Sequence, residues 1–174
     1  MTGTESGGRF FDTNVVVYGQ DHTAPLKRKR ALDLIGAAMQ ADCFVISTQV
    51  MQEFYNVVLR KKLATPANAA QLLSQLAEHT VVPASAESVL RGVALQRRHR
   101  LSIWDALIVQ AALDARCALL YSEDLQDGQR FELAGGAGPE LRVVNPFTAG
   151  PEVRAVHEEL APYRAAAKKR RRAK

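Results

Sequence analysis

The chain has 174 residues, of which 47% are hydrophobic and 24% are charged, and this balance favours one folded domain with an apolar core over a disordered chain. No apolar run reaches the roughly 18 residues that a membrane span requires, and the start of the chain has neither the basic nor the apolar region of a secretory signal. We therefore expect a soluble protein of the cytoplasm that has no membrane partner.

Basic charge is unevenly distributed along the chain. The net charge is +5, but six of the 23 Lys and Arg residues stand in the last seven positions. Three smaller basic clusters, at residues 27–30, 60–62 and 97–100, lie at predicted helix ends. Each cluster alone is typical of a solvated helix face, and only their convergence on one surface would indicate a rim that binds phosphate.

Short apolar segments alternate with longer helical patterns. We predict strands over residues 9–11, 43–47, 80–83, 117–122 and 141–146, because each segment is brief and apolar. We predict helices over residues 25–39, 48–62, 65–79, 85–98 and 101–117. Pro25 stands near the start of the first helix, and Thr65 followed by Pro66 is a typical helix start. This alternation predicts parallel strands with helices on both faces of the sheet.

One domain accounts for most of this pattern. We predict a disordered N-terminus over residues 1–8, the folded domain over 9–148, a helical extension over 149–167 and a basic tail over 168–174. Cys43 and Cys117 lie in apolar segments without CxxC spacing, so we expect buried thiols rather than a disulfide or a zinc site.

Four carboxylates stand where a parallel sheet gathers its functional residues, at the carboxyl ends of strands and the turns into helices. Asp12 ends the first predicted strand, Glu53 lies early in the helix after the second, Asp105 opens an apolar helix, and Asp124 follows the fourth strand. Each has a structural alternative. Asp12 could cap a helix, Glu53 could be an exposed helical residue, Asp105 completes a capping box with Ser102, and Asp124 could be a turn residue.

Together these acids suggest a metal site. A buried carboxylate is unfavourable unless it is paired or binds a cation, and no basic residue lies within two positions of Asp12, Glu53 or Asp105 in the sequence. Oxygen ligands favour a hard ion, so the predicted cofactor is Mg²⁺ or Mn²⁺.

The segments that carry these acids resemble a known family. The segments "FFDTNVVVYGQD", "ISTQVMQEFYNV", "LSIWDALIVQAA" and "YSEDLQDG", followed by "VVNPF", are similar to those of PIN-domain ribonucleases, and among them to the VapC-type toxins of toxin-antitoxin pairs. The resemblance spans residues 10–147. It implies a three-layer α/β/α sandwich with a mostly parallel central sheet, and metal-dependent cleavage of RNA. No residue pattern resembles a Ser-His-Asp or Cys-His nucleophile, so we expect hydrolysis without a covalent intermediate.

The resemblance also assigns roles to residues. Asp12 and Asp105 would be direct metal ligands, Glu53 and Asp124 would complete the acidic pocket, and Thr13, Asn14 and Ser122 would be supporting donors. The chain departs from the family pattern in two ways. Asp127 competes with Asp124 as the fourth acid, and the extension past Pro151 is longer and more basic than the pattern leads us to expect.

The resemblance implies three partners, which are an RNA substrate, a small antitoxin protein and a second copy of this chain. The basic tail is predicted to contact RNA phosphates through Lys168, Lys169, Arg170, Arg171 and Arg172. The alternative hypothesis is a non-catalytic RNA-binding module, in which the acids are structural and the tail makes the contacts.

Overall fold

The computed structural model describes residues 7–133, 136 and 138–148. The predicted extension over 149–167 and the basic tail over 168–174 lie outside the described residues, as does most of the predicted N-terminal segment. The elements follow in the order β1 (Arg9–Phe11), α1 (Thr13–Tyr18), α2 (Pro25–Gln40), β2 (Phe44–Ser47), α3 (Thr48–Arg60), α4 (Pro66–Leu76), β3 (Thr80–Val82), α5 (Ala86–His99), α6 (Ile103–Asp114), β4 (Leu119–Tyr121), β5 (Arg130–Phe131) and β6 (Leu141–Val144).

The strands form one sheet in the order β3-β2-β1-β4-β6-β5. All neighbouring strands are parallel except β5, which runs antiparallel to β6. The chain moves outward from β1 to β2 and β3, and then returns across the sheet to β4 on the other side of β1. Because such crossovers are right-handed, this reversal of direction sends the later helices to the opposite face.

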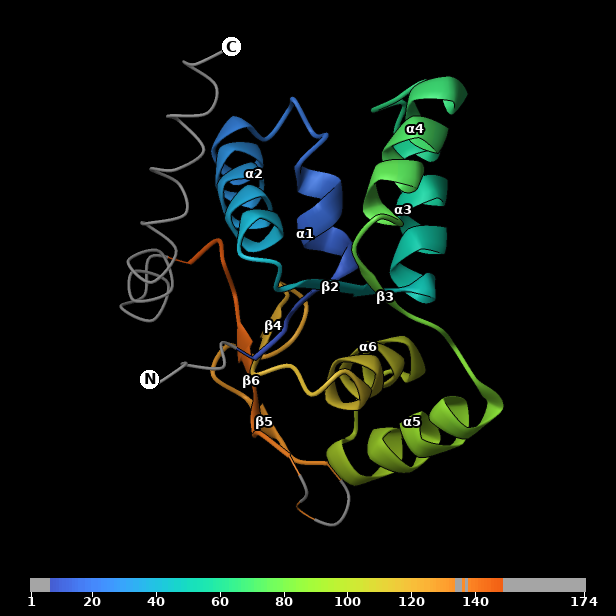
Figure 1. Cartoon of the computed structure of the whole chain (residues 1–174), viewed down its shortest axis with the longest axis vertical. Helices are drawn as coiled ribbons and strands as arrows, with labels where there is room; N and C mark the ends of the chain where they lie inside the picture. Colours follow the sequence, from blue (N-terminus) through green and yellow to red (C-terminus); the bar gives the residue numbers. More distant parts are fainter. Residues whose placement is uncertain (1–6, 134–135, 137, 149–174) are drawn as a thin grey trace.

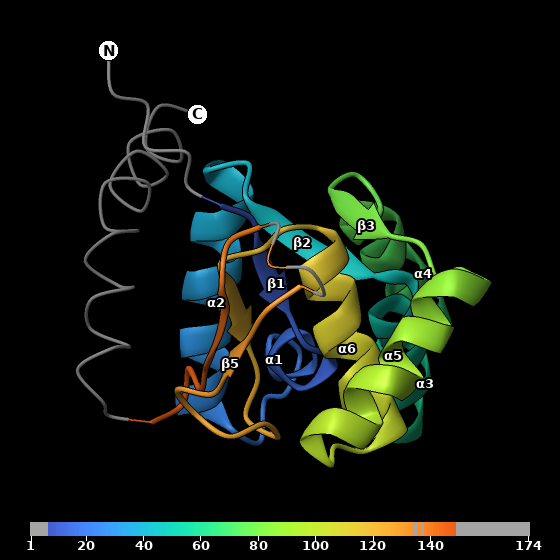
Figure 2. The same cartoon turned by 90° about the horizontal axis from the view of Figure 1, so that it is seen from below.

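Helices cover both faces of the sheet, as right-handed crossovers require. Figure 1 shows α1 to α4 on one side of the strands and α5 and α6 on the other, and the view from below in Figure 2 places α2 and α6 on opposite sides of β1. The predicted three-layer sandwich with a mostly parallel sheet is confirmed. After β1 the chain adds strands on one side of it, β2 and β3, and then on the other side, β4 and β6. In parallel sheets, a crevice forms at the carboxyl ends of the strands where the strand order reverses in this way. Here that crevice lies at the carboxyl end of β1.

Apolar strands and capped helices explain why these elements form. The rings of Phe44 and Tyr121 lie 4.8 Å and 4.9 Å from that of Phe11, in the middle of the core. Ser47, Thr65, Ser85 and Ser102 each accept a backbone hydrogen bond at the start of a helix. Within the described residues, no helix is both long and apolar enough to cross a bilayer.

The structure adds two elements that the sequence pattern did not predict. Helix α1 is only six residues long and follows β1 after a single residue, so its apolar residues could not be distinguished from a continuation of the apolar strand. Strand β5 is a two-residue edge strand with one exposed residue, and it has no apolar run to mark it. Cys43 and Cys117 are both buried, as predicted, and neither forms a disulfide. Burial raises the pKa of the Cys117 thiol to about 12.

Candidate active site

The four predicted acids line one cavity at the carboxyl end of β1. Its volume is about 420 Å³, and its walls include Asp12, Glu53, Asp105 and Asp124. Each acid comes from a different part of the chain, namely the end of β1, the second turn of α3, the first turn of α6 and the loop after β4. The topology therefore brings together residues that lie up to 112 positions apart.

Asp12 lies deepest, with 6% of its surface exposed. Its Oδ1 accepts a hydrogen bond from the backbone N–H of Thr13 (2.6 Å), and its Oδ2 accepts one from Ser122 Oγ (2.6 Å). Asp12 also caps α1, so the structural alternative predicted for it is realised as well. Burial raises the pKa of Asp12 to about 6; the nearby charges of Asp124 and Glu53 add to this rise, while its hydrogen bonds oppose it.

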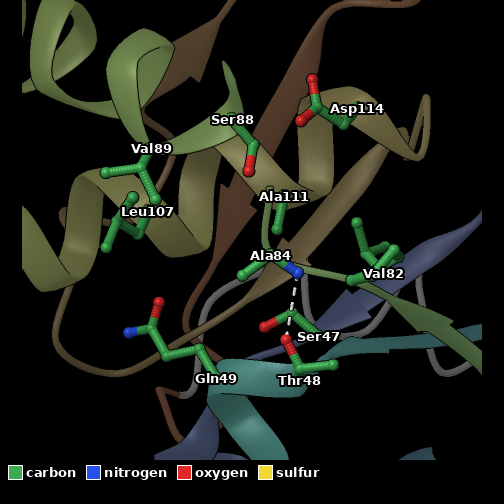
Figure 3. A pocket seen from close by; sticks show the side chains of 11 residues that line it. Ser47, Thr48, Gln49, Val82, Ala84, Ser88, Val89, Leu107, Ala111 and Asp114 are labelled. Carbon is green, nitrogen blue, oxygen red and sulfur yellow. Dashed lines mark hydrogen bonds between the residues drawn. The ribbon is translucent and has the colours of Figure 1, made fainter. Parts of the chain in front are cut away.

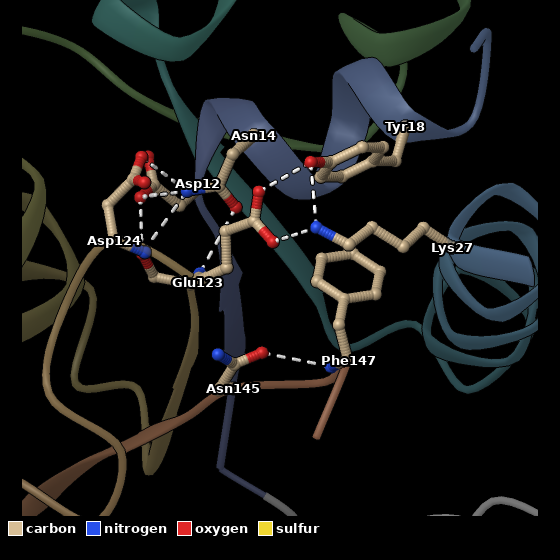
Figure 4. Close-up of polar contacts among 9 residues, drawn as sticks. Asp12, Asn14, Tyr18, Lys27, Glu123, Asp124, Asn145 and Phe147 are labelled. Carbon is tan, nitrogen blue, oxygen red and sulfur yellow. Dashed lines mark hydrogen bonds and ion pairs between the residues drawn. The ribbon is translucent and has the colours of Figure 1, made fainter. Parts of the chain in front are cut away.

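Asn14 links Asp12 to Asp124. Its Nδ2 donates to Asp12 Oδ2 at 3.1 Å and to Asp124 Oδ2 at 2.9 Å, and it lies 3.3 Å from Ser122 Oγ. The Asp124 backbone N–H donates in turn to Ser122 Oγ at 3.1 Å. Figure 4 shows these side chains facing one another across the end of β1. An amide group thus places partial positive charge between two carboxylates.

Glu53 is held by two donors on the opposite wall. Thr13 Oγ1 donates to its Oε2 at 2.6 Å, and Gln49 Nε2, one turn earlier in α3, donates to its Oε1 at 2.9 Å. Thr13, Asn14 and Ser122, the three predicted supporting donors, each contact at least one of the acids.

Asp105 has the geometry of a helix cap. Ser102 Oγ donates to Asp105 Oδ2 at 2.7 Å and accepts from the Asp105 backbone N–H at 3.1 Å. Ser102 therefore caps α6 as predicted, but within the described residues the Asp105 carboxylate accepts from the Ser102 hydroxyl and not from the backbone N–H that a full capping box requires. This cap does not compete with a role in the cavity, because the same carboxylate also lines the cavity wall.

Asp127 does not line the acidic cavity. It is exposed, and its Oδ1 accepts a hydrogen bond from the backbone N–H of Asn145 at 2.8 Å, which joins two loops. Of the two candidates for the fourth acid, only Asp124 faces the other three.

Glu123 is a fifth acid on the cavity wall that the sequence reasoning missed. Tyr18 OH donates to its Oε1 at 2.6 Å, and Lys27 Nζ donates to its Oε2 at 2.5 Å. The Lys27 ammonium also lies 4.5 Å from the centre of the Tyr18 ring and 5.2 Å from that of Phe147 (Figure 4). No signal in the sequence singles out Glu123, because its partner Lys27 is 96 positions away.

Two of the three basic clusters reach the acidic cavity. Arg60 and Lys61 line it from the end of α3, and Lys27 reaches it through Glu123. The third cluster does not, since Arg98 and His99 line a separate cavity between α5 and α6. A partial basic rim therefore surrounds the acids.

A smaller pocket adjoins the acidic cavity and shares Gln49 with it. Figure 3 shows Ser47, Thr48 and Gln49 facing Val89 and Leu107, with Thr48 Oγ1 accepting a hydrogen bond from the backbone N–H of Ala84. Its volume of about 40 Å³ leaves room for only about two or three water molecules. We therefore assign it no ligand.

The donor atoms of the acidic cavity are of the type that a hard divalent cation prefers. Its carboxylates offer oxygen ligands, and buried Asp12 has no ion pair with a basic side chain in the described part of the chain. Among the described residues, however, no three His, Cys, Asp or Glu side chains stand close enough together to hold an ion as they are.

Comparisons with known proteins agree with this fold. The sequence profile of the PIN domain matches residues 9–128, a range that contains all four acids. A solved toxin-antitoxin complex from Klebsiella pneumoniae is similar to the chain, with a TM-score of 0.54 and 22% identity over 80% of this chain and 98% of that chain. VapC20 of Mycobacterium tuberculosis, a toxin that cleaves the sarcin-ricin loop, is also similar, with a TM-score of 0.54 and 16% identity over 65% of this chain and 87% of that chain. No curated protein matches the sequence significantly.

Proposed function

This chain belongs to the PIN domain family, and on that premise we propose that it is a metal-dependent endoribonuclease that acts as the toxin of a toxin-antitoxin pair. The observation that carries the proposal is the convergence of Asp12, Glu53, Asp105 and Asp124 on one cavity at the carboxyl end of β1. Partly basic walls around an acidic floor suit a phosphodiester whose cleavage needs both a cation and phosphate contacts.

Each acid has a role in this proposal. Asp12 and Asp105 would hold Mg²⁺ or Mn²⁺, with Glu53 and Asp124 completing the acidic set. The ion would supply Lewis-acid activation of water and compensation of the charge that develops on the phosphate. Glu53 or Asp124 would orient the attacking water and accept its proton.

The supporting donors would set where these carboxylates point. Ser122 and the Thr13 backbone N–H fix Asp12, Thr13 Oγ1 fixes Glu53, and Asn14 ties Asp124 to Asp12. Such fixed donors limit the reorganisation that an acidic site would otherwise undergo during the reaction.

The partners are RNA, a small antitoxin and a second copy of this chain. The two solved structures described above, one a toxin-antitoxin complex and the other an RNA-cleaving toxin, support the first two partners. An open apolar hollow on α3 and α4, lined by Met51, Tyr55 and Leu73 among others, supports a homodimer. Residues 168–174 would add phosphate contacts, with Lys168, Lys169, Arg170, Arg171 and Arg172 as the contacting side chains.

Purified full-length protein tests the proposal when it is incubated with single-stranded RNA in Mn²⁺ and, separately, in EDTA. We expect cleavage in Mn²⁺ only. Asp12→Asn should abolish it, and Asp127→Asn, which changes a carboxylate outside the cavity, should retain it. Binding of RNA without cleavage under both conditions would refute the nuclease and support the alternative of a non-catalytic RNA-binding module.

A further inference from the structure

An exposed tryptophan stands at the edge of the acidic cavity. Trp104 is the single tryptophan of the chain, and 63% of its surface is exposed. It lies in the first turn of α6, directly before Asp105, and lines the same cavity as the four acids. Tryptophan is one of the largest apolar side chains, and its burial would stabilise a fold strongly. Its exposure at the edge of the cavity therefore leaves the ring accessible to a ligand that enters the cavity.

Trp104 differs from the other exposed apolar residues of the described chain. Those residues are aliphatic, and none of them lines the acidic cavity. Leu90, for example, is 71% exposed on α5. Tyr18 also lines the cavity, but its ring is half-buried and lies against the Lys27 ammonium. Among the large apolar side chains that are exposed in the described chain, only Trp104 offers an aromatic ring beside the acids.

The backbone beneath Trp104 is fixed. Gln49 Nε2, which holds Glu53, also approaches the Trp104 carbonyl oxygen at 3.4 Å. Ser102 caps the helix two residues earlier. The ring is therefore carried on a fixed helix turn, and a ligand that stacks on it would not have to order a loop.

The far end of α3 offers charge instead of apolar surface, because Gln49 in the first turn of α3 contacts the Trp104 carbonyl oxygen and Arg60 is the last residue of that helix. Arg60 and Lys61 are both exposed and line the cavity from α3. A ligand that spans the cavity would thus meet cations on one side, carboxylates in the middle and an aromatic face on the other. A single-stranded nucleic acid has this composition, with phosphates along its backbone and a flat base on each sugar.

We propose that Trp104 is a stacking site for a nucleobase of single-stranded RNA, next to the phosphate that the acids act on. The inference rests on the proposed function and extends it, because it names the part of the substrate that lies beside Asp105. Stacking reads the flat face of a base, so the site favours unpaired nucleotides over a continuous duplex.

Fluorescence tests this directly, because all tryptophan emission of the chain comes from Trp104. Full-length protein in EDTA is titrated with oligoadenylate and with an abasic oligonucleotide of the same length. We expect saturable quenching by oligoadenylate and none by the abasic strand. Binding of both strands with no change in emission would overturn the proposal. Emission that shifts with protein concentration or with a protein partner, and not with RNA, would place Trp104 in a protein interface and overturn it equally.

Substitutions supply a second readout, the anisotropy of labelled RNA. We expect Trp104→Leu to weaken binding about tenfold to a hundredfold, Trp104→Phe to weaken it much less, and the matched control Leu90→Ala to have no effect. Cleavage by Trp104→Leu should show a raised KM with little change in kcat. Equal affinity of the Leu and Phe variants would refute stacking. Because quenching is measured without cleavage, a protein that cuts RNA without quenching refutes only this inference, and one that quenches without cutting refutes only the nuclease.

Discussion

Asp12→Asn should stabilise the metal-free protein at neutral pH, although it weakens the hydrogen bonding of a buried side chain. The pKa of Asp12 rises from 3.8 to about 6 on folding, mainly because of burial. The ionised carboxylate therefore destabilises the folded state by about 3 kcal/mol once the pH exceeds the folded value. Asparagine has the same shape and no charge, so this penalty disappears in the variant.

Part of the gain is offset by hydrogen bonding. The Thr13 backbone N–H, Asn14 Nδ2 and Ser122 Oγ all donate to Asp12, and an asparagine amide group can accept at only one of its two ends. Losing or weakening one such bond costs about 1–2 kcal/mol. The net stabilisation is therefore about 1–2 kcal/mol, or a rise in Tm of about 2–8 °C for a chain of this size.

The pH dependence of the stability difference between Asp12→Asn and wild type shows whether the charge of Asp12 is its cause. Because the folded pKa is the higher one, the charge penalty is absent below pH 3.8 and complete above about pH 6. Urea unfolding in EDTA should show the advantage of Asp12→Asn at pH 7.5 and its loss as the pH falls toward 4. Asp127→Asn, an exposed control, should show no such trend. A variant that is less stable than wild type at pH 7.5, or equally shifted at every pH, would refute the reasoning.

Three other predictions concern the acids and the basic residues around them. Asp105→Asn should lose about 0.3–1 kcal/mol of stability in EDTA, measured by thermal melting, because it removes the acid of the cap made with Ser102; it should also lose cleavage in Mn²⁺, and retained cleavage would contradict its role. Lys27→Met should weaken RNA binding a few-fold by leaving Glu123 uncompensated, and Lys27→Met combined with Glu123→Gln should restore affinity in the same anisotropy assay. If the double variant binds as weakly as the single one, the charge of Glu123 is not the cause. Deletion of residues 168–174 should reduce the slope of log affinity against log salt by up to about four, because as many as six phosphate contacts are lost; an unchanged slope would contradict a role for the tail.

The sequence predicted the sheet and the placement of the acids because both follow from strong local patterns. Each main strand is a short apolar run, and each acid stands just after such a run or in the first turns of the next helix. Parallel topology then brings these positions to one edge of the sheet whatever the details of packing. Helix α1 and strand β5 were missed because six and two residues are too few to carry a period of their own.

The sequence could not show which groups contact each acid. Lys27 and Glu123 are 96 positions apart and still form an ion pair, and nothing in either local pattern marks the other as its partner. Asp124 and Asp127 are aspartates of the same loop, and the sequence does not distinguish them. In the structure, Asp124 contacts Asn14 in the cavity, whereas Asp127 contacts the backbone of Asn145. Side-chain direction depends on the conformation of the loop after β4, which is set by its contacts with α1 and with the end of β6.

The hydrogen bonds of the cavity also explain how so many acids can lie close together in this fold. Asn14 stands between Asp12 and Asp124, Thr13 holds Glu53, and Lys27 neutralises Glu123. These donors satisfy the carboxylates one at a time, which lowers their mutual repulsion but leaves Asp12 with a raised pKa because it is buried and none of its donors carries a full charge. The unfavourable free energy of the ionised carboxylates therefore falls mainly on Asp12, at the end of the central strand. A divalent ion would lower this free energy most by binding at Asp12, so we place Asp12 at the centre of the proposed metal site.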